Sequence, residues 1–313
     1  MHTISIAVPV FNEEKNVPEL LKRLPGVLNR HTGFTLGEIV FVDDGSSDRT
    51  LELLREGAQT DARIKILSFS RNFGHQIAVS AALDHVTGDA VAIIDGDLQD
   101  PPEFIPELAK KWLEGYAVVY AVRRKRKENI FKRAAYSIFY NVLRRIAEVE
   151  IPLDTGDFAI IDRKVVDVIK SMPEHSRFIR GLRAWSGFRS VGIEYERHAR
   201  FAGEPKYTLK KLIDLAASGV IGFSTVPLRV AAYIGLIMTI LSFIVGIGVI
   251  VLKLVYGSSV LGQGWASLML AIFFIGGMQM FMLGVIGEYI GRTYREVQGR
   301  PHYIVKEKIG FDS

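Results

Sequence analysis

Three short polar segments contain the side chains that could bind a ligand or a metal ion. They are residues 9–14, 43–48 and 95–100, and each follows an apolar run. Asp95 and Asp97 are separated by one glycine, so both carboxylates can reach one hard cation, and Gln99 adds a third oxygen. These oxygens predict a site for Mg²⁺ or Mn²⁺ that bridges to an anionic ligand such as a diphosphate.

Alternating strand and helix signals indicate how these segments are positioned. Strand-like runs cover residues 4–10, 39–42, 64–69, 90–94 and 117–122, and helical stretches cover 14–28, 49–57, 75–85 and 102–114. This alternation predicts an α/β fold with a mostly parallel sheet covered on both faces. Ligands bind beyond the carboxyl ends of such strands, so the three segments would line one crevice. Each segment alone also has the composition of a turn, and Asp48 is predicted to be a helix cap.

Several classes of protein are disfavoured by what the sequence lacks. With no cysteine there is no disulfide, thiolate nucleophile or zinc–thiolate site. A G-x-x-x-x-G-K-[S/T] loop is missing, and so is a G-x-G-x-x-G after the first strand, which disfavours kinases, NTPases and dinucleotide-dependent dehydrogenases. The formal net charge of +5 suits either nucleic acid or anionic lipid as a partner.

The hydrophobic residues concentrate near the C-terminus. Residues 230–252 and 254–287 contain no charged side chain, and a glycine-rich turn lies at 257–264. Each stretch supplies the roughly 20 apolar residues that a membrane-spanning helix needs. We therefore predict a transmembrane hairpin over 227–291, with helices near 230–252 and 265–287. Two buried helices of a soluble protein are the alternative, which the length of the uncharged stretches disfavours.

The hairpin also predicts the topology and the partners. Basic residues flank it on both sides and are missing from the turn, so residues 1–226 and a basic tail at 292–313 are expected to be cytoplasmic. Apolar stripes with basic flanks predict helices in the lipid interface near 131–147 and 208–226, although an ordinary core helix stays open for the first. The lipid bilayer accounts for the positive charge, so no nucleic-acid partner is expected. Glycines in both spans favour a homo-oligomer.

The polar motifs resemble those of the family 2 glycosyltransferases. More narrowly, they resemble the polyprenyl-phosphate glycosyltransferases, the group of bactoprenol glucosyltransferase and dolichyl-phosphate mannose synthase. The motifs are PVFNE at 9–13, DDGS at 43–46, RNFG at 71–74, DGDLQDP at 95–101, DTGDF at 154–158, RFAGEPKY at 200–207 and GEYIGR at 287–292. The sequence departs from the family at Ala159, where many relatives carry arginine, and at Lys206, where serine is common.

This resemblance implies a GT-A fold (a Rossmann-like, mixed, mostly parallel sheet), a nucleotide-sugar donor and a polyprenyl-phosphate acceptor. The donor would contact Pro9, Phe11, Glu13, Asp44, Asp95, Gly96 and Asp97. The metal, Mg²⁺ or Mn²⁺, would be held by Asp95, Asp97 and Gln99. Phosphate groups would be bound by Arg123, Arg200 and Lys206. Asp97 and Asp157 would be the catalytic residues.

The implied reaction is an inverting transfer of a hexose to a lipid phosphate at the bacterial inner membrane, by a multi-pass protein. UDP-glucose is the expected donor, with GDP-mannose, UDP-N-acetylglucosamine and UDP-amino-arabinose as alternatives. An acceptor phosphate is already largely ionised at neutral pH, so Asp157 is either a general base or a group that orients the sugar or an arginine. His75 is interpreted as a helix start, and Arg180 is assigned to neither the site nor the membrane interface. A nucleotide-sugar sensor and a processive polysaccharide synthase are the alternative functions.

Overall fold

The computed structural model describes residues 1–29, 31–123, 155–174, 177–196, 226–256 and 264–311. The chain divides into two compact units, one made of residues 1–219 with 300–313 and the other of residues 220–299. The predicted interfacial helix near 131–147 and residues 208–225 lie outside the described residues.

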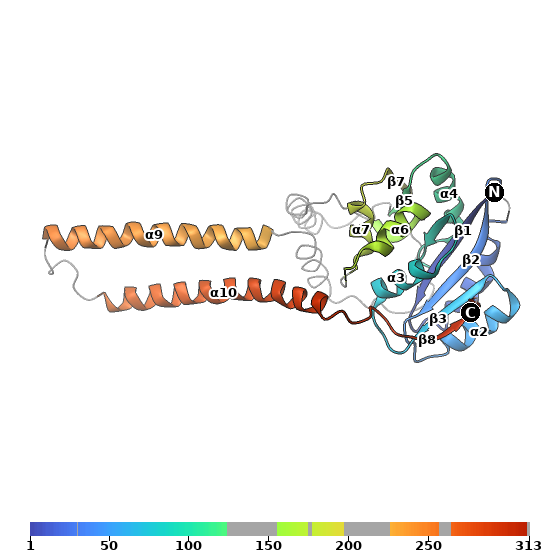
Figure 1. Ribbon diagram of the computed structural model, residues 1–313, viewed down its shortest axis with the longest axis horizontal. Helices are drawn as coiled ribbons and strands as arrows, with labels where there is room; N and C mark the ends of the chain where they lie inside the picture. Colours follow the sequence, from blue (N-terminus) through green and yellow to red (C-terminus); the bar gives the residue numbers. More distant parts are fainter. Residues whose placement is uncertain (30, 124–154, 175–176, 197–225, 257–263, 312–313) are drawn as a thin grey trace. The chain divides into compact units, whose positions relative to one another are not determined.

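The first unit is built on one eight-stranded sheet (Figure 1). Its strands are β1 (His2–Val10), β2 (Phe34–Asp43), β3 (Ile64–Phe69), β4 (Ala90–Ile93), β5 (Val118–Arg123), β6 (Thr155–Asp162), β7 (Ser190–Tyr195) and β8 (Val305–Ile309). The order across the sheet is β7-β5-β6-β4-β1-β2-β3-β8. Strands β1 to β4 are parallel to their neighbours within this set, whereas β6 and β8 run antiparallel. The predicted α/β class with a mixed, mostly parallel sheet is confirmed.

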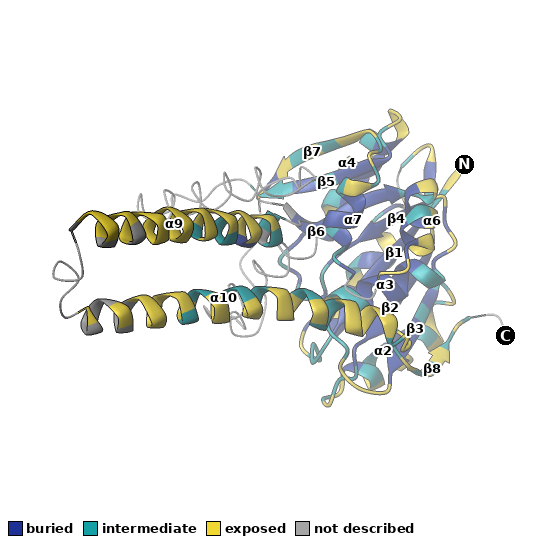
Figure 2. Cartoon of the chain, turned by 60° about the vertical axis from the view of Figure 1, so that its left-hand side comes forward, coloured by how far each residue is buried: buried dark blue, intermediate teal, exposed yellow. Residues whose placement is uncertain are grey.

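Helices cover both faces of this sheet, which explains why its central strands are apolar at successive positions rather than at alternating ones. One core groups Ile4, Ile6 and Val8 of β1 with buried side chains of α1 (Val17–Arg23), α2 (Thr50–Thr60) and α4 (Ile105–Leu113). Helices α3 (His75–His85), α6 (Arg163–Ser171) and α7 (Ile179–Trp185) pack together against the sheet. Figure 2 shows the strands buried between these layers.

The register of β6 positions a carboxylate that the strand–helix pattern alone does not place. Ile93 of β4 pairs with Ala159 of β6 in antiparallel orientation. Two residues onward from Ile93 is Asp95, and two residues back from Ala159 is Asp157. The carboxyl end of β4 and the amino end of β6 therefore meet at one edge of the sheet. This is the edge where β1 and β2 also end.

The C-terminal residues are part of the first unit. Residues 292–313 were expected to form a basic tail, but α10 continues to Val297 and Val305–Ile309 forms β8 beside β3. Lys306 and Lys308 are exposed and alternate with the half-buried side chains of Val305, Glu307 and Ile309. The expectation of a separate tail missed this strand because its charges obscured the period-two pattern of an edge strand.

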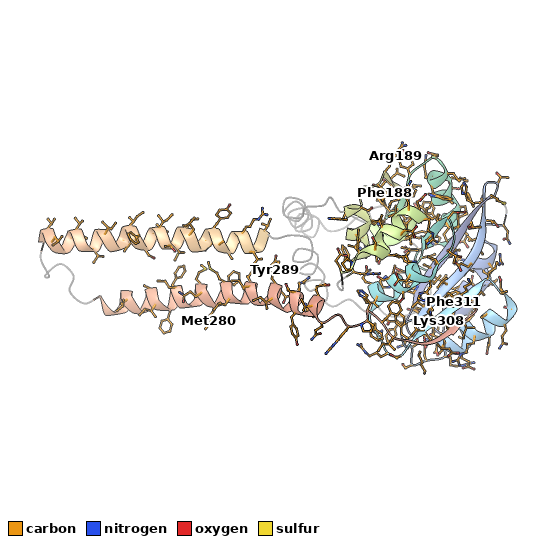
Figure 3. The ribbon with its side chains drawn as sticks, viewed as in Figure 1. Phe188, Arg189, Met280, Tyr289, Lys308 and Phe311 are labelled. Atoms are coloured by element: carbon orange, nitrogen blue, oxygen red, sulfur yellow. The ribbon has the colours of Figure 1, made fainter. Side chains whose placement is uncertain are left out.

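Two long apolar helices make up the second unit. They are α9 (Val226–Tyr256) and α10 (Trp265–Val297). Within them, Leu228–Val249 and Ala271–Val297 are long and apolar enough to cross a membrane. Large apolar side chains are exposed along both helices (Figure 2), and Met280 is one that projects from α10 (Figure 3). The two helices overlap the stretches predicted for the hairpin, 230–252 and 265–287, and α10 continues beyond the second of them to Val297.

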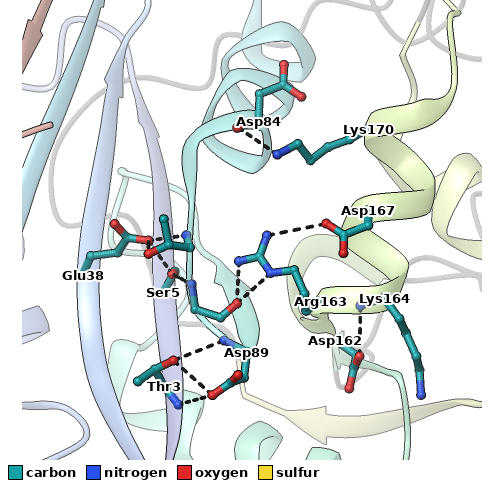
Figure 4. A network of polar contacts seen from close by, with 12 residues as sticks. Thr3, Ser5, Glu38, Asp84, Asp89, Asp162, Arg163, Lys164, Asp167 and Lys170 are labelled. Atoms are coloured by element: carbon teal, nitrogen blue, oxygen red, sulfur yellow. Dashed lines mark hydrogen bonds and ion pairs between the residues drawn. The ribbon is translucent and has the colours of Figure 1, made fainter. Parts of the chain in front are cut away.

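A buried carboxylate ties β1, β2 and the segment before β4 together near the amino ends of β1 and β4 (Figure 4). Glu38 accepts hydrogen bonds from Ser5 Oγ at 2.7 Å and Thr87 Oγ1 at 2.9 Å, and it pairs with Lys65 Nζ at 2.8 Å. Burial raises the pKa of Glu38, but Lys65 and the hydrogen bonds outweigh it and hold the pKa below its ordinary value of 4.5. The ionised form is therefore preferred in the folded state.

Glu38→Gln is expected to destabilise the fold by about 1–3 kcal/mol at pH 7, because the amide cannot satisfy all the donors around it. A depressed pKa contributes stability above the unfolded pKa, and that contribution is lost as the pH falls through the folded value. The wild-type stability should therefore approach that of the variant below pH 4.5. Thermal unfolding from pH 7 to pH 3 checks this, with exposed Glu56→Gln as the control. A constant difference at every pH would contradict the assignment.

Candidate active site

A buried carboxylate at the carboxyl edge of the sheet collects three hydrogen-bond donors. Asp157 is 3 % exposed. One of its oxygens, Oδ2, lies 2.9 Å from His75 Nε2 and 2.9 Å from Gln76 Nε2, and the other accepts from Arg180 Nε at 2.8 Å. Asp95 adds a second carboxylate, with Oδ1 3.6 Å from His75 Nε2. The site therefore alternates positive and negative groups contributed by β6, α3, α7 and the end of β4.

Hydrogen bonds to Asp44 fix the start of α3. Asp44 follows β2, and its carboxylate accepts from the backbone N–H groups of Phe73 at 2.7 Å and Gly74 at 2.9 Å. Gly74 has φ +104°, a conformation that glycine adopts without strain. The loop after β3 is thereby tied to the end of β2, and the next residue is His75.

The three polar segments identified in the sequence pack closely against one another. Asn12 N–H donates to Ser46 Oγ at 2.9 Å, which joins the first segment to the second. A Cβ at Gly96 would lie 3.0 Å from the carbonyl oxygen of Pro9, and one at Gly45 would lie 2.5 Å from the backbone of Arg71. Glycine is therefore required at both places. The structure thus brings the predicted segments with Pro9, Phe11, Glu13, Asp44 and Asp95 to one edge of the sheet.

The electrostatics of the cluster favour a cationic imidazole between two carboxylates. Burial lowers the pKa of His75, but the hydrogen bond to Asp157 and the charge of Asp95 outweigh this and raise it to about 9. Burial raises the pKa of Asp157, but His75 and Arg180 outweigh that and hold it far below its ordinary value. Burial raises the pKa of Asp95 to about 6, partly opposed by His75. Asp157 is thus an ionised carboxylate with little tendency to take up a proton.

Two groups of side chains are candidates for holding a metal ion, and they share Asp95. One is the triad of His75, Asp95 and Asp157, whose ligand atoms lie within 4.8 Å of one another. The other is the predicted set of Asp95, Asp97 and Gln99, in which Asp97 Oδ1 accepts the Gln99 N–H at 3.1 Å. The Asp157 carboxylate already pairs with two cationic side chains, His75 and Arg180, and their positive charge would repel a divalent cation bound there. Oδ1 of Asp95 is buried and accepts no hydrogen bond within the described residues, so it fits a cation ligand.

Of the predicted phosphate-binding residues, the described part of the chain includes Arg123. Its guanidinium lies over the backbone of β6, because a Cβ built on Gly156 would be 2.8 Å from Nη2 of Arg123. Arg123 ends β5 and pairs with Tyr195 of β7, whose hydroxyl donates to buried Asp100. Arg123 therefore approaches β6 at Gly156, the residue before Asp157. Arg200 and Lys206 lie outside the described residues.

Gly156→Ala tests this close approach. The added methyl group would displace the Arg123 guanidinium, while Arg123 and Asp157 themselves stay unchanged. If Arg123 binds substrate phosphate, we expect about a tenfold rise in KM, the size of effect of one weakened charge-assisted hydrogen bond. Initial rates check the change, with Gly26→Ala as a control at a glycine that has no positive φ and no neighbour within 4 Å. An unchanged KM in the Gly156 variant would show that Arg123 does not bind substrate phosphate.

Three side chains around Asp157 were not assigned to it from the sequence. His75 was interpreted as a helix start, which is confirmed because α3 begins there, but its contact with Asp157 was not predicted. Arg180 was left unassigned, and Gln76 was not considered. All three contact Asp157. The position of His75 and Gln76 directly after the RNFG motif was the sequence signal that could have placed them in the site. The contact between Arg180 of α7 and Asp157 depends on tertiary packing, and no local sequence pattern indicates it.

Comparison with known proteins adds independent evidence. Residues 5–170 match the glycosyl transferase family 2 model, and residues 226–293 match the GtrB C-terminal hairpin model. The glycosyltransferase YkcC of Bacillus subtilis is 47 % identical over 310 residues, covering 99 % of this chain and 95 % of YkcC. A prophage bactoprenol glucosyl transferase homolog of Escherichia coli K12 is 43 % identical, covering 97 % of this chain and 98 % of that protein.

A phage protein and a solved structure are also similar. The bactoprenol glucosyl transferase of Shigella phage SfX is 42 % identical over 306 residues, covering 97 % of this chain and 99 % of that protein. Glucosyl-3-phosphoglycerate synthase from Mycobacterium tuberculosis, in complex with Mn²⁺, UDP-glucose and phosphoglyceric acid, is 20 % identical with a TM-score of 0.47, over 70 % of this chain and 78 % of that one. The family model covers more than half of the chain and the relatives cover nearly all of it, so the protein belongs to glycosyl transferase family 2 and carries the C-terminal hairpin of the GtrB type.

Proposed function

We propose that this glycosyltransferase moves a hexose from a nucleotide sugar to polyprenyl phosphate, with UDP-glucose as the donor and undecaprenyl phosphate as the acceptor. The observation that carries the proposal is the ionised Asp157, held by His75 and Arg180 beside Asp95 at the carboxyl edge of the sheet. Relatives that match over almost the whole chain are named bactoprenol glucosyl transferases, which supports both the lipid acceptor and glucose.

The carboxylates that follow β4 fit a divalent cation. Asp95, Asp97 and Gln99 would hold Mg²⁺ or Mn²⁺ through oxygen, the ligand type that these ions prefer. Asp95 Oδ1 supports this assignment, because it is buried and accepts no hydrogen bond within the described residues, and His75 Nε2 lies 3.6 Å away. When bound, the ion would offset the negative charge that builds on the leaving nucleoside diphosphate.

Asp157 is assigned a positioning role rather than that of a general base. Its oxygens already accept hydrogen bonds from three side chains, and its pKa lies far below the range of an effective base. The acceptor phosphate, with a second pKa of about 6, is already largely ionised at neutral pH. Its oxygen attacks the anomeric carbon, the bond from that carbon to the diphosphate breaks, and the configuration inverts. The transfer therefore proceeds without a proton acceptor.

Cationic side chains offset the repulsion between two anionic substrates. Asp157 fixes the orientation of His75 and Arg180, so both can present positive charge toward the crevice. Arg123 lies on the neighbouring strand, and Arg200 and Lys206 are proposed to complete the phosphate contacts.

The hairpin supports a membrane setting for the acceptor. Its two apolar helices are long enough to span a bilayer, and the basic residues lie outside the turn. We therefore place the catalytic unit on the cytoplasmic face of the bacterial inner membrane, where polyprenyl phosphate would be presented. Interfacial helices near 131–147 and 208–226 and a homo-oligomer remain part of this proposal.

The donor and the acceptor can be tested together. The full-length protein in detergent micelles would receive UDP-glucose, UDP-N-acetylglucosamine, UDP-amino-arabinose or GDP-mannose, with undecaprenyl phosphate or undecaprenol as acceptor. We expect a glucosyl product with the phosphate and none with the alcohol, because the alcohol is not ionised at neutral pH. A polymeric product would favour a synthase. Donor binding without transfer would favour a sensor and overturn the proposal.

A further inference from the structure

One aromatic side chain from the C-terminal segment contacts two supports of the active site. Tyr303 lies between the end of α10 and the start of β8. Its ring stacks on Phe69 with centroids 5.0 Å apart and an angle of 19°, and its hydroxyl donates to Asp84 Oδ2 at 3.1 Å. The Ser70 N–H donates to the carbonyl of Ile304 at 3.0 Å, which fixes the backbone next to the stacked pair.

The first contact leads to the loop that carries His75. Phe69, the last residue of β3, also meets the ring of Phe73 edge-on, with centroids 5.6 Å apart. The Phe73 N–H is one of the two that bind Asp44. Tyr303 therefore packs on the aromatic side chain at the start of the loop that leads to His75. The end of the same loop is fixed to Asp44 after β2 by backbone hydrogen bonds.

The second contact leads to the helix that carries Arg180. Asp84, near the end of α3, also pairs with Arg177 Nη1 at 3.5 Å. Arg177 is buried, donates from Nη2 to the Met172 carbonyl at 3.2 Å, and lies two residues before α7. Asp84 thus links Tyr303 to the segment that leads into Arg180.

We propose that Tyr303 is a positioning residue, which aligns His75 through Phe69 and Arg180 through Asp84, and so orients both cations on Asp157. The effect on transfer rests on the proposed function, whereas the effect on the loop does not. Because Tyr303 lies six residues after α10 ends, the chain that leaves the hairpin completes the support of the catalytic cluster.

Two substitutions separate the two contacts. Tyr303→Leu removes the stacking and the hydroxyl, and Tyr303→Phe removes the hydroxyl alone. Glu307→Gln is the matched control, because Glu307 lies on β8 and pairs with Arg55 rather than with Phe69 or Asp84. Each full-length variant in detergent micelles would be compared by thermal unfolding, by hydrogen exchange of residues 70–77 and by the kcat and KM for UDP-glucose.

Tyr303→Leu should speed exchange at residues 70–77 about tenfold and lower kcat about tenfold, the effect of losing an aromatic pair with a hydrogen bond. Tyr303→Phe should leave that exchange unchanged and lower kcat about threefold. Glu307→Gln should leave both unchanged. The proposal is overturned if Tyr303→Leu has the same exchange rates and the same kcat as Glu307→Gln. It is also overturned if the loss of kcat in every variant simply follows the loss of thermal stability. If the wild-type protein transfers no sugar but Tyr303→Leu still exchanges faster at residues 70–77, the alignment of the loop is supported and the proposed function is refuted.

Discussion

Asp157→Ala is expected to lower the rate of sugar transfer by about 100- to 1,000-fold, the cost of losing a preorganised charged group in an active site. His75, Gln76 and Arg180 would lose their shared acceptor together. Without that carboxylate, the two cations repel each other and no longer hold fixed orientations. Asp157→Asn should be nearly as damaging, because its amide nitrogen would face donors instead of accepting from them.

The pH dependence of the residual activity distinguishes positioning from base catalysis. If Asp157 positions the cations, the acidic limb of the rate profile reflects ionisation of the acceptor phosphate, with a pKa of about 6, and survives in both variants. If Asp157 is the base, the wild-type enzyme can also use the singly ionised phosphate, and the acidic limb near pH 6 appears only in the variants. Asp167→Ala, at an exposed carboxylate of α6, is the control that should keep wild-type activity. An Asp157→Ala rate close to that of this control would contradict the assigned role.

Asp97→Ala is expected to reduce transfer to background, a loss of about 1,000-fold or more, because the ion would lose a carboxylate ligand and the leaving diphosphate its charge compensation. Binding of Mn²⁺ in the presence of UDP, measured by calorimetry, should weaken in parallel. His75→Ala should lower transfer but keep the affinity for Mn²⁺, because His75 is bound to Asp157 in the proposed arrangement.

The opposite pattern would move the metal site. If His75→Ala abolishes Mn²⁺ binding and Asp97→Ala leaves it intact, then the triad of His75, Asp95 and Asp157 holds the ion. Asp167→Ala again controls for a general loss of surface charge, because this carboxylate is 60 % exposed and pairs with Arg163.

The sequence predicted the parallel part of the sheet because each strand there has a local signal. The runs at 4–10, 39–42, 64–69, 90–94 and 117–122 correspond to β1 to β5, and the four predicted helices correspond to α1 to α4. Strands β6, β7 and β8 were missed. β6 was interpreted only as a motif, and the Lys and Glu side chains of β8 resemble a solvated tail. Their assignment depends on pairing with strands that are distant in sequence, which local periodicity does not encode.

The candidate site was predicted in part for the same reason. Asp44 and Asp95 lie at the carboxyl ends of parallel strands, so their convergence follows from topology. The place of Asp157 beside Asp95 follows from the antiparallel register of β6. His75 and Arg180 could not be assigned to Asp157 from spacing, because one contact depends on a positive-φ glycine before α3 and the other on the packing of α7.

Transfer of radiolabelled glucose from UDP-glucose into undecaprenyl phosphate is the measurement that tests the central claim most directly. It would be made with Mg²⁺, with EDTA, with EDTA followed by excess Mg²⁺, and with the Asp97→Ala protein. We predict a lipid-linked product with Mg²⁺, none with EDTA, recovery after Mg²⁺ is restored and none from the variant. A product that forms equally in EDTA would contradict the metal site, and no product under any condition, despite measurable donor binding, would contradict the transferase assignment itself.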